Sequence, residues 1–178
     1  MEFDRDYLDF DNYYVKENVC AFTGHRPESF SFGTNESSPE CLRIKRRLKE
    51  EILKMVQNGV DTFITGMARG VDMWAAEAVL ELSRQFIDIR LIAAIPYVNQ
   101  PRPWSDAEKE RYGRIIDNST AIVLRQDYCR GCLLYRNRYM VDNSAHLIAV
   151  YNGSGKGGTA YTVDYARKRG RDIVIIDV

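Results

Sequence analysis

Residues 147–159 read LIAVYNGSGKGGT, an apolar run that breaks into four glycines before helical patterning resumes. This order predicts a strand, a tight loop and the start of a helix. Glycine lets the backbone approach a ligand closely, and the first turn of a helix offers free N–H groups and a partial positive charge. The loop is therefore a candidate site for a phosphate or another anion, although such loops also serve as plain turns.

Two other apolar runs end in the same way. Residues 19–22 lead into a loop that begins at Thr23, and residues 61–64 lead into a loop that begins at Thr65. Each loop contains glycine and leads toward a helical segment. Parallel strands deliver such loops to one edge of a sheet, where open α/β sheets bind ligands. We therefore expect the three loops to line one cleft.

Strands and helices alternate along the chain, which predicts right-handed crossovers and a three-layer α/β, Rossmann-like fold with a mostly parallel sheet of about six strands. The pattern indicates a single domain over residues 1–178, with an N-terminal extension at 1–17 and a ligand-binding core at 18–178. Strands are predicted at residues 19–22, 61–64, 89–95, 121–124, 147–151 and 173–176, and helices at 38–58, 70–86, 132–143 and 157–169, with one more opening at a capping box at 105–108. The second helix is predicted to bury Trp74, Ala75, Ala78, Val79, Leu82 and Phe86.

The charge balance gives no general attraction to nucleic acid or to an anionic membrane, because 25 Lys and Arg offset 25 Asp and Glu. No apolar run approaches the ~20 residues of a membrane span. The acidic, aromatic N-terminus does not resemble a signal peptide. We therefore expect a cytoplasmic protein with reduced cysteines and no membrane partner; a homo-oligomer is compatible with the sequence.

The second loop places Arg69 between two glycines and ahead of Asp72. Arg69 either adds charge at an anion site or lies on the surface. Asp72 either binds a ribose hydroxyl or caps the helix, and the residues leave both interpretations open.

Cys129 and Cys132 form a CxxC pattern ahead of a predicted helix, where thiol redox or metal chemistry is conceivable. A zinc site needs two more ligands, and the other cysteines and histidines show no second paired spacing. We therefore predict no metal.

The three loops together resemble the YpsA family, in the Rossmann-like superfamily shared with the Lonely Guy enzymes and DprA. The resemblance rests on TGHRP at residues 23–27, GMARGVDMWAAE at 66–77 and GGT at 157–159, together with Gln100, Trp104 and RNRYMVD at 136–142. It covers nearly all of residues 18–178. It implies a nucleotide or nucleotide-derived ligand, with an ADP-ribose-like molecule as one form.

Lonely Guy enzymes, which release a base from a ribose phosphate, carry adjacent glutamates after their glycine motif and an arginine on the preceding helix. This chain has Arg136 or Arg138 on the preceding helix, but it has Ala160, Tyr161 and Thr162 where the glutamates would stand. Without a well-placed carboxylate, water activation lacks its base. No catalytic residue is therefore assigned, and the remaining candidates are His25, Arg138 and Asp164.

Ligand binding at the strand ends, in a sensor or regulatory module, is the function that we favour. Alternatives are a nucleotide-processing enzyme, either an N-glycosidase or a phosphoribohydrolase, and a single-stranded DNA binding protein. The last is less favoured because the basic run at residues 43–49 lies opposite an apolar helix face. Trp104 either stacks on a base or packs in the core. The predicted ligand-binding residues are Thr23, Gly24, His25, Arg26, Gly66, Met67, Ala68, Arg69, Gly70, Asp72, Trp104, Asn152, Gly153, Gly157, Gly158 and Thr159.

Overall fold

The structure, a computed structural model, describes residues 16–178, so nearly all of the predicted extension at residues 1–17 lies outside the described part. The strands are β1 (Val19–Gly24), β2 (Thr62–Thr65), β3 (Arg90–Ile95), β4 (Thr120–Val123), β5 (His146–Val150) and β6 (Asp172–Ile176). The α-helices are α2 (Pro39–Gln57), α3 (Val71–Ser83), α4 (Asp106–Ile116), α5 (Cys132–Asp142) and α6 (Gly157–Lys168), and 3₁₀ turns lie at η1 (Lys16–Asn18) and η2 (Pro27–Ser29).

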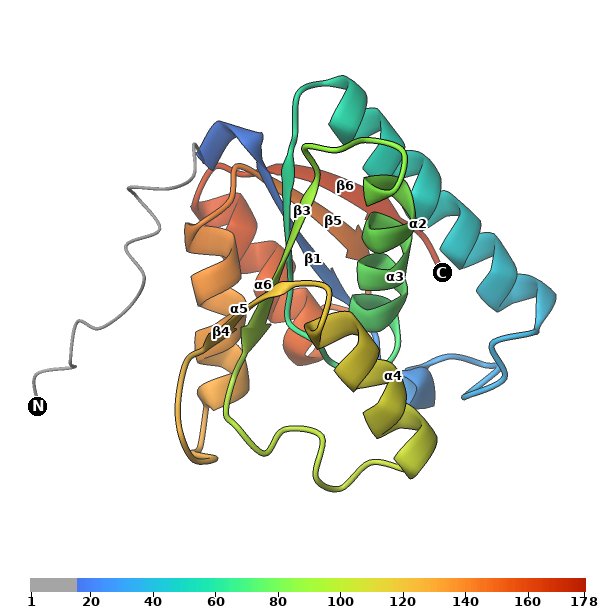
Figure 1. The fold of residues 1–178 in the computed structure, drawn as a ribbon, viewed down its shortest axis with the longest axis vertical. Coiled ribbons are helices and arrows are strands. Elements are labelled where there is room, and N and C mark those ends of the chain that lie inside the picture. The colour runs from blue at the N-terminus through green and yellow to red at the C-terminus, as the bar shows by residue number, and fades with distance from the viewer. Residues whose placement is uncertain (1–15) are drawn as a thin grey trace, which may run out of the picture.

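The six strands form one sheet in the order β4-β3-β2-β1-β5-β6, and every pair is parallel (Figure 1). The predicted α/β, Rossmann-like fold is therefore confirmed. The register places Gly24 at the end of β1 beside Val150 at the end of β5. Because all strands run the same way, the loops that follow them leave from one edge of the sheet.

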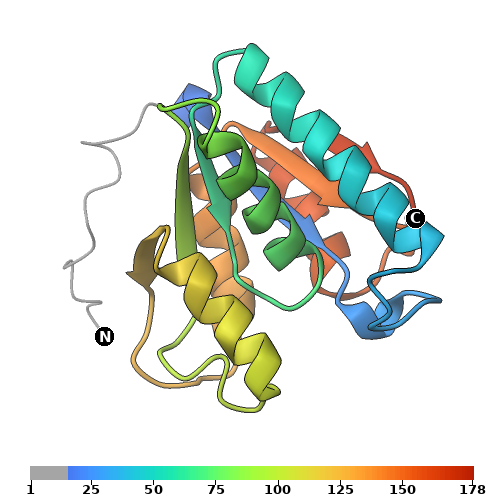
Figure 2. The ribbon, with the colours of Figure 1, turned by 45° about the vertical axis from the view of Figure 1, so that its right-hand side comes forward.

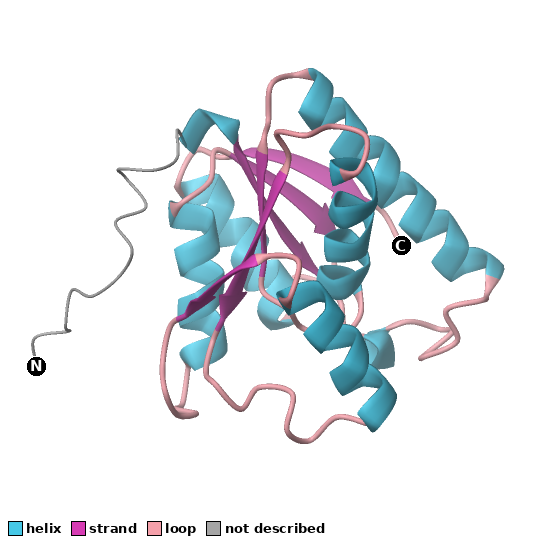
Figure 3. Ribbon diagram, viewed as in Figure 1, coloured by secondary structure: helices cyan, strands magenta, loops and turns pink. Residues whose placement is uncertain are grey.

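Helices cover both faces of the sheet. Figure 2 shows α2, α3 and α4 in front of the strands, with α5 and α6 behind, and Figure 3 shows the same three layers by element type. Two apolar clusters correspond to these faces, one built on Phe22, Phe63 and Leu48 and the other on Ile64, Leu147 and Met140. None of the helices within residues 16–178 is long and apolar enough to cross a membrane.

Local sequence signals account for the helix starts. The Ser38 side chain accepts the N–H of Cys41 at 3.1 Å and caps α2, with Pro39 in the first turn. The capping box predicted at residues 105–108 is present at α4, where Ser105 and Glu108 each bond the other's backbone N–H.

The end of α3 differs from the prediction. The helix stops at Ser83 rather than continuing to residue 86, and Phe86, which was predicted to be buried, is 39% exposed. After Arg84 the chain turns with bonds to the Leu82 carbonyl, which carries Phe86 away from the core.

The strand order creates a switch point at the centre of the sheet. From β1 the chain moves outward through β2, β3 and β4, and then returns to place β5 on the other side of β1. The connection after β1 runs to α2 on one face, and the connection after β5 runs to α6 on the other. These loops diverge, and the crevice between them is where open α/β sheets bind ligands.

Candidate functional site

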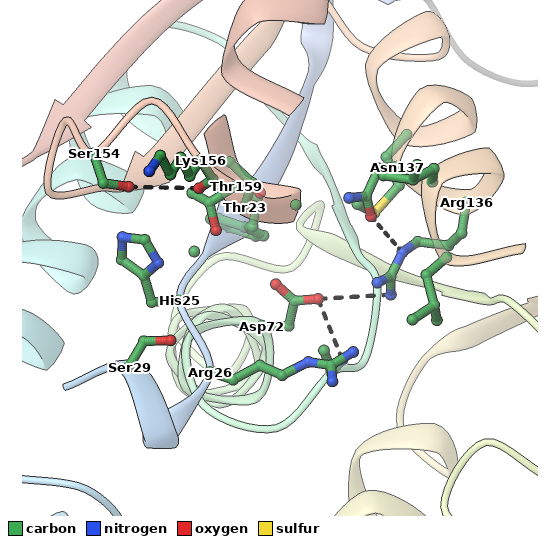
Figure 4. A pocket seen from close by; sticks show the side chains of 18 of the residues that line it. Thr23, His25, Arg26, Ser29, Asp72, Arg136, Asn137, Ser154, Lys156 and Thr159 are labelled. Atoms are coloured by element: carbon green, nitrogen blue, oxygen red, sulfur yellow. Dashed lines mark hydrogen bonds and ion pairs between the residues drawn. The ribbon is translucent and has the colours of Figure 1, made fainter. Parts of the chain in front are cut away.

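A cavity of about 480 Å³ lies at this switch point, within the size range of small-molecule sites. Figure 4 shows side chains from the β1 and β5 loops, α3 and α5 around it. Of the predicted ligand-binding residues, it is lined by Thr23, Gly24, His25, Arg26, Ala68, Asp72, Asn152, Gly157, Gly158 and Thr159. The structure thus brings all three predicted loops to one cavity.

The start of α6 forms one wall. Its N-cap residue, Lys156, makes no side-chain capping bond, so the N–H groups of the first turn have no side-chain cap. A Cβ added to Gly158 would meet nothing within 4 Å. This open space lies against a helix N-terminus, and the Lys156 side chain borders the same cavity (Figure 4). The wall is suited to an anion.

The β1 loop forms the opposite wall and is tied to the β5 loop. The Asn152 N–H donates to Nε2 of His25 at 3.3 Å, and the His25 ring lies near Phe30 and Tyr151. Burial lowers the pKa of His25, which favours the neutral ring that this bond requires. Gly24 has a steric role, because a Cβ there would overlap the Val71 side chain.

A buried ion pair lies beneath the cavity. Asp72 is 6% exposed and Arg136 is 4% exposed, with Oδ2 of Asp72 3.7 Å from the Arg136 guanidinium. Figure 4 shows both Arg26 and Arg136 reaching toward Asp72. Burial raises the pKa of Asp72 and lowers that of Arg136, while each partner's charge opposes the shift of the other.

Asp72 is not the N-cap of α3, because that position is Gly70. Its carboxylate instead accepts the Ala68 N–H at 3.2 Å and so braces the loop after β2. Arg136 donates to the Gly66 carbonyl and, through Nε, to the side chain of Asn137 at 2.8 Å. The pair therefore connects the β2 loop to α5 across the base of the cavity.

A second cavity of about 280 Å³ adjoins the first and shares Arg26, Ala68 and Leu133 with it. Both Arg69 and Trp104 line this second cavity. Arg69 forms ion pairs with Glu28 and, at 3.2 Å, with Glu108, so its charge is already matched. Trp104 is half-buried and contacts Tyr112 edge to face, with ring centres 5.6 Å apart.

Several predicted residues line neither cavity. Gly66, Met67, Gly70 and Gly153 belong to the same loops but lie beside the walls. Of the catalytic candidates, Arg138 is exposed and bonds the Tyr161 hydroxyl, and Asp164 is exposed and pairs with Arg167 at 3.2 Å. His25 alone of the three faces the first cavity.

Sequence reasoning missed most of the contribution of α5, from which it named only Arg136 or Arg138. Leu133, Arg136, Asn137 and Met140 line the first cavity, whereas the neighbouring Arg138 points elsewhere. Their spacing of three, four and seven residues is one face of a helix, and that period is the signal that would have found them. In the CxxC pattern, Cys132 is buried at the start of α5 and Cys129 is partly exposed. Residues 16–178 contain no group of three or more Cys, His, Asp or Glu side chains placed to hold a metal ion.

The fold is that of a Rossmann-like α/β protein with a cavity at its strand carboxyl ends. The chain belongs to the YpsA family, described as the YspA SLOG family, whose model matches residues 20–177. UPF0398 proteins of Bacillus cereus and Bacillus thuringiensis are each 30% identical over 156 residues, covering 85% of this chain and 84% of the relative.

Two solved structures share the fold. The DNA processing protein A of Streptococcus pneumoniae matches with a TM-score of 0.62 and 20% identity, over 92% of this chain and 51% of that one. That of Helicobacter pylori, described for its single-stranded DNA binding mode, matches with a TM-score of 0.59 and 20% identity, over 88% of this chain and 64% of that one. The chain thus spans half to just under two thirds of these proteins.

Proposed function

We propose that the chain binds a nucleotide or nucleotide-derived ligand, such as ADP-ribose, and acts as a sensor or regulatory module. The observation that carries the proposal is the composition of the cavity at the switch point. There the uncapped start of α6 and the side chains of Lys156 and Arg26 surround open space. Free N–H groups, a helix dipole and two cations together suit a phosphate.

The same cavity favours binding over hydrolysis. Among its described lining residues, Asp72 is the single carboxylate, and it is occupied by the Ala68 N–H and by Arg136. The positions after Thr159 include Ala160 and Thr162, which are buried and carry no acid. Cleavage of a glycosidic bond needs a carboxylate free to activate water or to stabilise positive charge on the sugar.

A thermal-shift and calorimetry series tests the proposal. The probes are AMP, ADP-ribose and NAD, with adenosine as the matched compound that lacks phosphate. A ligand at 100 times its Kd stabilises the native state by about 2.7 kcal/mol, which corresponds to a rise in Tm of roughly 5–11 °C for a chain of this size. Saturable binding of the phosphate-bearing probes, with adenosine much weaker, is the expected result.

The competing functions are tested by two further measurements, a base-release assay and binding of single-stranded oligonucleotides. Release of free base from a nucleoside monophosphate would establish an enzyme. Affinity for single-stranded oligonucleotides that grows with their length and falls steeply with salt would establish a nucleic-acid-binding protein. If none of the mononucleotide or dinucleotide probes binds, the proposed function is wrong.

A further inference from the structure

One residue that lines the second cavity carries a buried acceptor that lacks a donor. Gln100, in the loop after β3, is 5% exposed and lines this cavity. Within the described residues, its side-chain oxygen Oε1 is buried and has no hydrogen-bond partner. A buried carbonyl oxygen without a donor is costly, and such atoms are rare in folded proteins.

The orientation of the Gln100 amide is fixed by its other end. Nε2 donates to the carbonyl of Met67 at 3.2 Å and to that of Gly66 at 3.4 Å. Rotating the amide would set its oxygen against these two carbonyl oxygens, so the nitrogen must face the β2 loop. Oε1 is therefore the polar atom of this side chain that is left without a partner.

Two aromatic side chains, Tyr97 and Trp104, also line the second cavity. Trp104 and Tyr97 are half-buried, and Trp104 is held in place by its edge-to-face contact with Tyr112. A volume of about 280 Å³ is just below the range of complete drug-sized pockets, about 300–1,000 Å³. The space therefore suits one part of a ligand whose charged part lies in the adjoining cavity, to which Arg26 is common.

We propose that the second cavity is the base subsite of the nucleotide ligand and that Gln100 selects a base with an amino group. The inference rests on the proposed function and specifies its ligand. An amino N–H of adenine or cytosine supplies the donor that Oε1 lacks, while Trp104 offers a face for stacking. Hypoxanthine and uracil carry a carbonyl oxygen where those bases carry the amino group, and that oxygen would repel Oε1.

The test compares two pairs of nucleotides with the unaltered protein, AMP against IMP and CMP against UMP. Members of each pair differ in the amino group and share the sugar phosphate. The amino-bearing member is expected to bind roughly tenfold tighter or more, because its absence leaves a buried acceptor unpaired. Using the unaltered protein removes any question of folding.

Two variants assign the discrimination to named residues. Q100M should lower the affinity for AMP to that for IMP, whereas Trp104→Ala should weaken both by a similar factor and Trp104→Phe should bind nearly normally. Equal affinities of the parent for AMP and IMP, and for CMP and UMP, would overturn the base subsite and leave the proposed function standing. Failure of every nucleotide and of ADP-ribose to bind would overturn both.

Discussion

A substitution at Gly158 can test the proposed anion site without a large effect on the stability of the fold. Its backbone does not have the positive φ of the neighbouring Gly157, and a Cβ there would enter open space. Gly158→Val should therefore fold, with stability within about 1 kcal/mol of the parent, because valine is not a worse helix former than glycine. Its methyl groups would occupy the space assigned to phosphate.

We expect Gly158→Val to weaken AMP binding by about tenfold or more, as measured by calorimetry. The control is Gly113→Val on α4, where a Cβ also meets nothing and which lies outside both cavities. Unchanged affinity in a folded Gly158→Val protein would place the phosphate elsewhere.

Gly66 is required for a different reason, the close approach of Arg136. A Cβ at Gly66 would overlap the Arg136 guanidinium, which donates to the Gly66 carbonyl. Gly66→Ala should displace Arg136 from Asp72 and lower the free energy of unfolding by about 1–3 kcal/mol. In an Arg136→Met background the same change should cost less, because the obstructing group is gone.

A double-mutant cycle by urea unfolding measures this coupling. Additive effects of Gly66→Ala and Arg136→Met would show that the two residues do not interact in the way the geometry indicates.

The helices α2, α3 and α4, which cover one face of the sheet, are joined by a charged cluster. Arg111 of α4 pairs with Glu36, ahead of α2, and with Glu77 of α3, each at 2.6 Å, and Lys45 also contacts Glu36 at 2.6 Å. Burial acts to raise the pKa of Glu36, but the bonds from Arg111 and Lys45 prevail and lower it to about 2. The helices α2, α3 and α4 are thus joined through two carboxylates, Glu36 and Glu77, and their basic partners.

The Glu36 cluster should contribute to stability only while Glu36 is ionised. The native pKa of about 2 lies below the unfolded value of 4.5, so the contribution is complete above pH 4.5 and is lost as the pH falls toward 2. Because Glu36 is only partly buried, we expect about 1–2 kcal/mol at pH 7 rather than the full linkage value.

Urea unfolding of Glu36→Gln at pH 7 and pH 3.5 measures this contribution. The difference from the parent should shrink at the lower pH. Glu50→Gln on the exposed face of α2, which removes a carboxylate outside the cluster, is the control. A difference that does not change with pH would contradict the assignment.

The helices and strands were more predictable from the sequence than the site was, and particular residues show why. Ser38 and the capping box at Ser105 act through neighbours three residues away, so the sequence contains the whole interaction. Phe86 was mispredicted because its apolar side chain fits the helical period, while the end of α3 depends on a turn beyond Ser83. Arg138 and Arg136 are both on α5, but Arg138 bonds Tyr161 of α6 whereas Arg136 pairs with Asp72 of α3. These partners are distant in the sequence.

Both faces of the sheet should unfold together. Leu48 belongs to the cluster on one face and Met140 to the cluster on the other, and each is 1% exposed. Leu48→Ala and Met140→Ala should each lower the free energy of unfolding by about 2–5 kcal/mol. The six paired strands connect the faces, so one cooperative transition is expected.

Two spectroscopic probes distinguish one cooperative transition from independent unfolding of the two faces. Trp74 and Trp104 both pack on the α2–α4 face, so their fluorescence reports that face alone, whereas far-UV circular dichroism reports the whole domain. The two curves should coincide in the parent and in both variants. A Met140→Ala protein whose fluorescence transition stays at the parent midpoint would show independent halves.

The position of the cavity follows from strand order, which was not predicted. The alternation of strands and helices indicates a parallel sheet. It does not indicate that β1 lies between β2 and β5, because that order depends on long-range pairing. The convergence of the loops was expected from the parallel rule. The helical period of α5 could have indicated that Arg136 faces the cavity. Its ion pair with Asp72 and the unpartnered oxygen of Gln100 could not be expected, because both depend on groups that meet only in the folded chain.

The pairing of β1 with β5 also has a consequence for biosynthesis. Cys20 of β1 pairs with His146 of β5, which lies far along the chain. During translation β1 is therefore made early, but it can pair with β5 only after most of the chain has been synthesised. Such distant pairings close large loops and form slowly. One wall of the cavity comes from the β1 loop and the other from the β5 loop and α6, so a nascent chain that ends before residue 150 holds half a site. Ligand affinity would then be acquired near the end of translation, and a prematurely terminated product would not compete for the ligand.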